Sequence, residues 1–189
     1  MASVNGQEVG ARYGTVLAWS GLLPGAHSVI PTFREDGKLP VGRHESGPGE
    51  VEQRLVQTFP LSVTRPDIYR GWRARRQAVS QIVPIEMEWI DGSFTTSKRD
   101  PGDIDAATFI QGESLDQLQP EDMKRLSGAL SGLGVKLRFG CDAYLVAIRP
   151  STHPLATLYQ MYRGYWDHWW SHSKEDGTEK GYVSVRGEP

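Results

Sequence analysis

Two aspartates separated by a single residue, Asp103 and Asp105, are the side chains whose type and spacing most clearly suggest chemistry. In a β-strand, residues i and i+2 project to the same face, with Cα atoms about 6.5–7 Å apart. Their carboxylates can therefore converge on one divalent cation, or on two cations about 3.5–4 Å apart. The ligands are hard oxygens, and the sequence has no His/Cys cluster with zinc-like spacing. Mg²⁺, or Mn²⁺ in its place, is therefore the expected cofactor.

A Gly-Ser pair, Gly92-Ser93, precedes Asp103 by a spacer of nine residues. Glycine allows a ligand to approach the backbone closely, and the serine hydroxyl and nearby backbone N–H groups form an anion site. Within the spacer, Lys98 is a candidate phosphate contact, although adjacent Lys and Arg residues are more often simply solvated. A phosphate-binding turn followed by a pair of metal ligands is the arrangement needed to hold a nucleoside triphosphate.

Gly-Ser, the nine-residue spacer and Asp-Ile-Asp together resemble the signature of the nucleotidyltransferase fold, the DNA polymerase β-like superfamily. The wider chain is similar to an uncharacterised small bacterial branch of that superfamily, related to the minimal nucleotidyltransferases of toxin–antitoxin and defence systems. Three segments carry this likeness, which covers roughly residues 33 to 186: FREDGKLPVGRHES, DGSFTTSKRDPGDID and EKGYVSV.

The resemblance implies an α/β (α+β) domain with a small mixed sheet and flanking helices. It also implies an enzyme that moves a nucleoside monophosphate from an NTP to an acceptor hydroxyl. Gly92, Ser93 and Lys98 would then bind the nucleotide. Asp103 and Asp105 would hold Mg²⁺, and the third carboxylate that the superfamily supplies from a later strand would be Asp142, as metal ligand or base.

The acceptor implied by the resemblance is an RNA 3′ end, such as that of tRNA, or a hydroxyl on a partner protein. A cognate toxin or antitoxin is the corresponding partner. Minimal antitoxin-type relatives place Ala-Arg-Gly one residue after the Gly-Ser pair, whereas this chain has FTTSK at residues 94–98. Both the acceptor and the partner therefore stay open.

A second hypothesis is a catalytically inactive module of the same fold that binds RNA or a partner protein. Gly-Ser is common in ordinary turns, and acids near strand ends are often only solvated. Asp142 separates the two hypotheses. Three carboxylates converging near Gly92 and Ser93 favour the enzyme, and an Asp142 that points away favours the binding module.

The elements that must position these residues alternate between helical and extended patterns. Hydrophobic periodicity and punctuation by Gly and Pro define the boundaries. Helices are predicted from about residue 50, over 64–82, over 120–133 and from Pro154, and strands over 85–90, 103–110, 135–148 and 180–185. This order predicts a small mixed sheet covered by helices.

Three local patterns carry predictions about burial. The arginine cluster RGWRARR reads as an exposed helix face, with guidance of RNA or a triphosphate as the alternative. In residues 85–90, Glu86 and Glu88 alternate with apolar residues, as in a half-buried strand. The aromatic run YQMYRGYWDHWW reads as core or helix packing, with base stacking or a protein interface as the alternative. Cys141 reads as a buried strand residue and not a nucleophile.

Length and composition bound the remaining possibilities. The chain has 189 residues, 38% hydrophobic and 23% charged, and a formal net charge of −2, which fits one domain and excludes a generally basic nucleic-acid binder. We expect an N-terminal extension at 1–32 and the nucleotidyltransferase-like domain at 33–189. A single cysteine indicates a reducing compartment, and no apolar run reaches about 18 residues, so a cytoplasmic protein without a membrane span is expected. Residues 15–26 only faintly resemble a signal peptide.

Overall fold

The computed structural model describes residues 30–130 and 132–187. Most of the expected N-terminal extension, residues 1–29, lies outside the described residues. The described chain forms a five-stranded mixed sheet in the order β1-β5-β2-β3-β4. The predicted α+β class is confirmed. The strands are β1 (Gly42–Ser46), β2 (Met87–Asp91), β3 (Ile104–Gln111), β4 (Cys141–Ile148) and β5 (Gly181–Val185).

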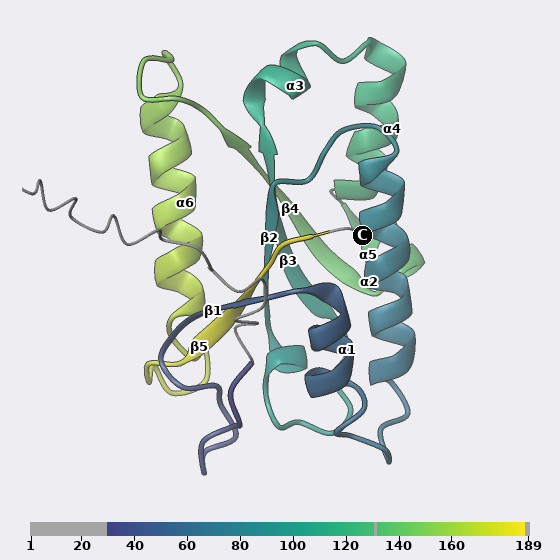
Figure 1. Ribbon diagram of the computed structural model, residues 1–189, viewed down its shortest axis with the longest axis vertical. Helices are drawn as coiled ribbons and strands as arrows, with labels where there is room; N and C mark the ends of the chain where they lie inside the picture. The colour runs from purple at the N-terminus through teal and green to yellow at the C-terminus, as the bar shows by residue number, and fades with distance from the viewer. Residues whose placement is uncertain (1–29, 131, 188–189) are drawn as a thin grey trace, which may run out of the picture.

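Helices cover both faces of this sheet, so the molecule has three layers (Figure 1). One face carries α6 alone, and the opposite face carries most of the other helices (Figure 1). Strands β1 and β5 are parallel, as are β3 and β4, whereas β2 runs antiparallel to both of its neighbours. The helices are α1 (Pro48–Leu55), α2 (Arg65–Ser80), α3 (Gly112–Asp116), α4 (Pro120–Leu130), α5 (Leu133–Phe139) and α6 (Ala156–Trp170), with a short 3-10 turn η1 (Ser93–Thr95).

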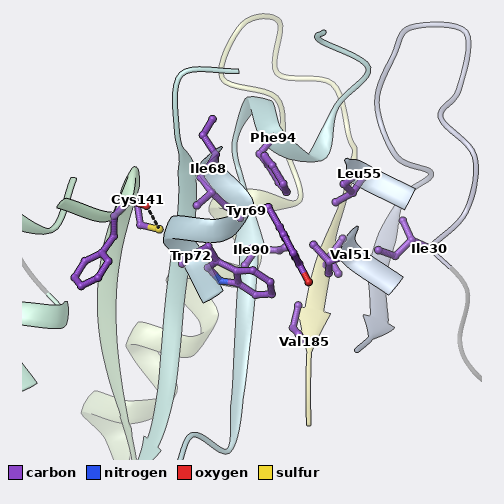
Figure 2. Packing of buried hydrophobic residues seen from close by; sticks show 14 of the residues in the cluster. Ile30, Val51, Leu55, Ile68, Tyr69, Trp72, Ile90, Phe94, Cys141 and Val185 are labelled. Atoms are coloured by element: carbon purple, nitrogen blue, oxygen red, sulfur yellow. Dashed lines mark hydrogen bonds between the residues drawn. The ribbon is translucent and has the colours of Figure 1, made fainter. Parts of the chain in front are cut away.

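The main core lies between the sheet and helices α1, α2 and α5. Figure 2 shows apolar side chains of α1 and α2 packed against residues of β2 and β5. Trp72 of α2 is fully buried there, and Ile30 also belongs to this cluster. Cys141 is buried in it as predicted, where its thiol donates a hydrogen bond to the carbonyl of Phe139 at 3.3 Å (Figure 2).

Helix α6 closes the other face with part of the aromatic run. Trp170 is fully buried and packs with Trp89 and Tyr182, and Trp166 lies half-buried beside them. The prediction that this run forms core or helix packing is confirmed for these residues. Tyr165 and Trp169 stay exposed, stacked with an interplanar angle of 9°. Among the described residues, no helix is long and apolar enough to cross a membrane.

The predicted strand over 135–148 is wrong over residues 135–140. Residues 133–139 form helix α5, and the strand begins only at Cys141. Val135 and Phe139 are spaced i and i+4, so both bury on one side of the helix. Gly140 then adopts the left-handed conformation, with φ 64° and ψ 27°, which ends the helix. The predicted helix over 120–133 is correspondingly shorter and ends at Leu130.

The prediction of an exposed arginine face on residues 70–76 is also wrong for its last two members. Arg75 and Arg76 are buried, and both pair with Glu88 of β2, which is itself fully buried. Glu88 therefore does not lie on a solvated face of its strand, as its alternation suggested. A guanidinium and a carboxylate compensate each other's charge, so both can enter the core together.

Candidate active site

Three aspartates form a row across three neighbouring strands. Asp91 at the end of β2 pairs in register with Asp105 of β3, and Asp105 pairs in register with Asp142 of β4. Directly opposite residues of adjacent strands project to the same face of the sheet. Asp103 lies two residues before Asp105 and joins the row from the segment that leads into β3. The sheet therefore gathers acids from β2, β3 and β4 at the end where β2 stops and the other two strands begin.

Gly92 follows Asp91, and both its backbone conformation and the nearby Asp105 side chain require a glycine at this position. Its φ of +83° is a conformation that residues with a Cβ rarely adopt. A Cβ built on Gly92 would also lie 2.3 Å from Oδ2 of Asp105. The glycine thus allows the Asp105 carboxylate to sit against the turn, a role that differs from the close approach of a ligand expected from the sequence.

Arg65, at the start of α2, fixes the loop after the Gly-Ser pair. Its buried guanidinium donates hydrogen bonds to the carbonyl oxygens of five residues, four of them in that loop. The ring of Phe59 stacks beneath it at 3.8 Å. Burial lowers the pKa of Arg65 to about 10, so the group stays charged at neutral pH. The five accepting residues are Leu55, Phe94, Thr96, Lys98 and Arg99.

A cavity of about 490 Å³ opens beside this loop. Four residues singled out from the sequence line it together: Gly92, Ser93, Lys98 and Asp105. The other two, Asp103 and Asp142, do not line this cavity and lie along the row of acids beyond Asp105. Thr96 and Ser97 of the same loop add hydroxyl groups to the wall. Further hydroxyl and ammonium groups come from distant segments: Lys38, Ser173, Lys174 and Lys180.

Asp91 and Lys180, which also line this cavity, form a buried ion pair. The Lys180 ammonium contacts Oδ1 of Asp91, and the hydroxyl of Thr95 donates to the same oxygen at 3.1 Å. Burial raises the pKa of Asp91, while Lys180 and Thr95 act in the opposite direction. The negative charge of Asp91 is thus already compensated by the Lys180 ammonium.

Asp103 and Asp142 share a different cation. The ammonium of Lys136, on α5, lies 2.6 Å from Oδ2 of Asp103 and 2.8 Å from Oδ2 of Asp142. The two carboxylates hold the pKa of Lys136 above its usual value. All three side chains are partly open to solvent, with exposures of 24% for Asp103, 36% for Asp142 and 42% for Lys136. An ammonium thus takes the position of a bridging cation between them.

Asp105, in the middle of the row, lacks such a partner. Within the described residues its carboxylate makes no hydrogen bond and no ion pair. Burial, with smaller contributions from the carboxylates of Asp91, Asp103 and Asp142, raises its pKa to about 6 against the attraction of Lys174. A cation that binds beside such a carboxylate stabilises its ionised form. A carboxylate with a raised pKa in a cavity wall is therefore a candidate cation ligand.

The donor chemistry of the row fits Mg²⁺, which prefers carboxylate oxygens. The side chains do not form a ready metal cage, however. In residues 30–130 and 132–187, no three His, Cys, Asp or Glu side chains are grouped as metal ligands would be. Asp103 and Asp142 turn to Lys136 instead. Metal binding would therefore centre on Asp105, with the neighbouring carboxylates as the further ligands available.

Sequence reasoning missed three of the cations that shape this region. Lys136 was hidden because residues 135–139 read as a strand, although Val135, Phe139 and Gly140 carry the signals of a short capped helix. Lys180 gives no local signal of a role, since its partner lies 89 residues away in the sequence. Lys174 follows α6 and gives no local signal at all.

Comparison with protein families gives one match. Residues 31–186 match a family of unknown function, DUF6932. The chain belongs to this family. The match includes all five strands and every residue of the acid row. Comparison with curated proteins and with solved structures gave no significant match.

Proposed function

We propose that this member of DUF6932 is a metal-dependent nucleotidyltransferase of the DNA polymerase β-like fold. It would transfer a nucleoside monophosphate from an NTP to an acceptor hydroxyl in the cytoplasm. The observation that carries the proposal is the placement of Gly92, Ser93, Lys98 and Asp105 in the wall of one cavity. The row of acids begins in that wall and continues away from it along the sheet.

Phosphate binding in this proposal falls to the cavity wall. Ser93 and its neighbouring hydroxyls donate hydrogen bonds to phosphate oxygens, and ammonium groups compensate the triphosphate charge. Lys98 and Lys174 are the lysines best suited to this, because Lys38 already pairs with Asp176 and Lys180 with Asp91. Arg65 contributes indirectly by holding the carbonyls of the loop away from the phosphates.

Transfer of the nucleotidyl group falls to the acid row. The bond between the acceptor oxygen and the α-phosphorus forms, the bond from the α-phosphorus to the bridging oxygen breaks, and pyrophosphate leaves with the electron pair. The acceptor proton passes to a carboxylate of the row, which we assign to Asp142. When bound, Mg²⁺ supplies neutralisation of the phosphoryl charge and acidification of the acceptor hydroxyl. Asp103 and Asp105 orient the nucleotide by holding that ion.

The acceptor in this proposal is an RNA 3′ end, such as that of tRNA, or a hydroxyl on a partner protein. The test incubates the purified chain with each radiolabelled NTP, Mg²⁺ and total RNA, and in parallel with a cell lysate. Label should enter RNA or a protein band. Because removing a metal ligand costs at least about 3 kcal/mol of transition-state stabilisation, Asp105→Ala should reduce labelling by about a hundredfold or more.

A matched control separates this loss from a general effect of removing an acid. Asp67 is exposed on α2, with 71% of its side chain open to solvent, and Asp67→Ala should label as the unchanged chain does. Labelling that persists in Asp105→Ala contradicts the assigned role of Asp105. No label in RNA or in any protein, with any NTP, contradicts the enzyme proposal.

The binding module is the second candidate, and one observation favours it. Asp103 and Asp142 are already paired to Lys136, so the row holds an internal cation without any metal. Arg75 and Arg76 are buried and cannot contact RNA, so this candidate would act through the exposed side of α6. Filter binding of labelled RNA with Trp169→Ala distinguishes it. This candidate requires RNA or protein binding that depends on Trp169 and is unaffected by Asp105→Ala.

A further inference from the structure

Lys136 is held in a fixed place by the helix that carries it. Val135 and Phe139 on either side of it are buried, and Gly140 ends the helix one residue before β4. The Lys136 side chain therefore starts from an anchored backbone and reaches Asp142, opposite Asp105 on β4, and Asp103, two residues before Asp105. Its ammonium contacts one oxygen of Asp103 and one of Asp142, and uses two of its three N–H donors.

The carboxylates of the row outnumber the ammonium groups that contact them. Four carboxylates belong to the row: Asp91, Asp103, Asp105 and Asp142. Two ammonium groups contact them, Lys180 at Asp91 and Lys136 at Asp103 and Asp142. Two negative charges are therefore uncompensated by direct contact, which equals the charge of one divalent cation.

The uncompensated negative charge is centred on Asp105. Asp105 alone among the four carboxylates has no ion pair within the described part of the chain. A cation bound there leaves the contacts of Lys136 intact. A cation placed between Asp103 and Asp142 must first displace the ammonium from both of them.

We propose that Lys136 is the second cation of this site, so that the chain takes up one divalent ion where two-metal enzymes take up two. This inference rests on the proposed function. The ammonium holds the carboxylates of Asp103 and Asp142 together beside Asp105. Its third N–H is free to donate to an oxygen of the phosphoryl group. Lys136 is thus a catalytic residue that replaces a metal ion at one of two positions.

The test counts metal ions by anomalous scattering. Crystals of the full chain are grown with Mn²⁺ and inorganic pyrophosphate, a probe that does not depend on base preference. The unchanged chain should show one Mn²⁺, at Asp105. Lys136→Met should show two, the second between Asp103 and Asp142, because removal of the ammonium leaves both carboxylates unpaired. Lys136→Arg retains the charge and should show one.

Lys124→Met is the matched control, since Lys124 is exposed on α4 and, among the described residues, forms no ion pair with the row, and it should show one ion. Two ions in the unchanged chain, one in Lys136→Met, or no ion in either would overturn the inference. A second count in solution, from the loss of the free Mn²⁺ resonance, should give the same numbers. It also covers a variant that does not crystallise.

The outcome separates this inference from the proposed function. One ion without transfer of label to any acceptor would leave the role of Lys136 as a bridging cation standing and remove the enzyme proposal. Two ions with transfer of label would do the reverse. In activity assays Lys136→Met should lower kcat more than it raises KM for the NTP, because the ammonium acts on the transferring group.

Discussion

Acids lie on both faces of the same sheet, and the two faces treat them in opposite ways. On the face under α2, Glu88 is fully buried and receives hydrogen bonds from Trp72 and Thr108 and ion pairs from two arginines. On the other face, Asp105 has a raised pKa and no direct partner, and its neighbours Asp103 and Asp142 share the one partly exposed ammonium of Lys136.

The difference lies in the cations, because the acids themselves look alike in the sequence. Arg75 and Arg76 are anchored in the middle of a long helix and present rigid planar donors, so the Glu88 cluster is closed. Lys136 is partly exposed and Lys174 is exposed to solvent, and neither is enclosed by the core as the two arginines are. A fully compensated acid serves the fold, whereas an acid left short of a cation is available to a ligand.

The largest change in stability should follow a substitution in the Glu88 cluster. Glu88→Gln leaves two buried guanidinium groups without a counter-charge, so we expect it to lower the free energy of unfolding by about 3–5 kcal/mol. Urea unfolding followed by circular dichroism measures this. Glu86→Gln, two residues away and exposed, should change stability by no more than about 0.5 kcal/mol. Equal effects of the two substitutions would mean that the cluster is not a structural unit.

Arg65 tests whether the same kind of anchoring supports the open site. Arg65→Met leaves five carbonyl oxygens without their donor, and buried unsatisfied groups cost about 1–3 kcal/mol each before relaxation. We expect a loss of about 2–4 kcal/mol in urea unfolding. We also expect faster hydrogen exchange confined to residues 94–99. Arg65→Lys should restore little, since an ammonium has three donors and no planar fork. Uniform exchange across the chain would contradict the anchoring role.

Substitution of Asp105 should change the free energy of unfolding in the opposite direction. The Asp105 pKa of about 6 exceeds the usual 3.8, so its contribution to stability is full below about pH 4 and is lost as pH rises through 6. In EDTA at pH 8, Asp105→Asn should therefore raise the free energy of unfolding by about 1–3 kcal/mol, and at pH 4 the two chains should match. Thermal unfolding at both pH values measures the difference. A loss of stability at pH 8 would place Asp105 with Glu88 as a structural acid.

Local sequence signals predicted the parts of the site that depend on neighbours along the chain. Gly92, Ser93 and Asp105 were identified from their spacing, and alternation placed Asp105 on the face that it occupies. Strands β2, β3 and β5 and helices α2 and α6 were likewise predicted from periodicity and Pro or Gly punctuation. Asp142 was correctly placed on a strand, although that strand is shorter than predicted.

The contacts that assign a role to each acid could not be predicted in this way. The pairing of Glu88 with Arg75 and Arg76, and of Asp91 with Lys180, joins elements whose contact depends on the tertiary fold. An arginine-rich helix reads as solvated until a buried carboxylate is known to face it. The placement of Lys136 required the short helix α5, whose apolar spacing also suits a strand.

The position of β5 in the sheet has a consequence for synthesis of the chain. Residues 181–185 form the last strand of the described residues, yet they insert between β1 and β2, which are synthesised much earlier. A nascent chain that stops short of them has two open strand edges and an uncompensated Asp91. A chain terminated before residue 180 would therefore be an aggregation-prone product without the Asp91–Lys180 pair, so that only copies translated through β5 carry the site.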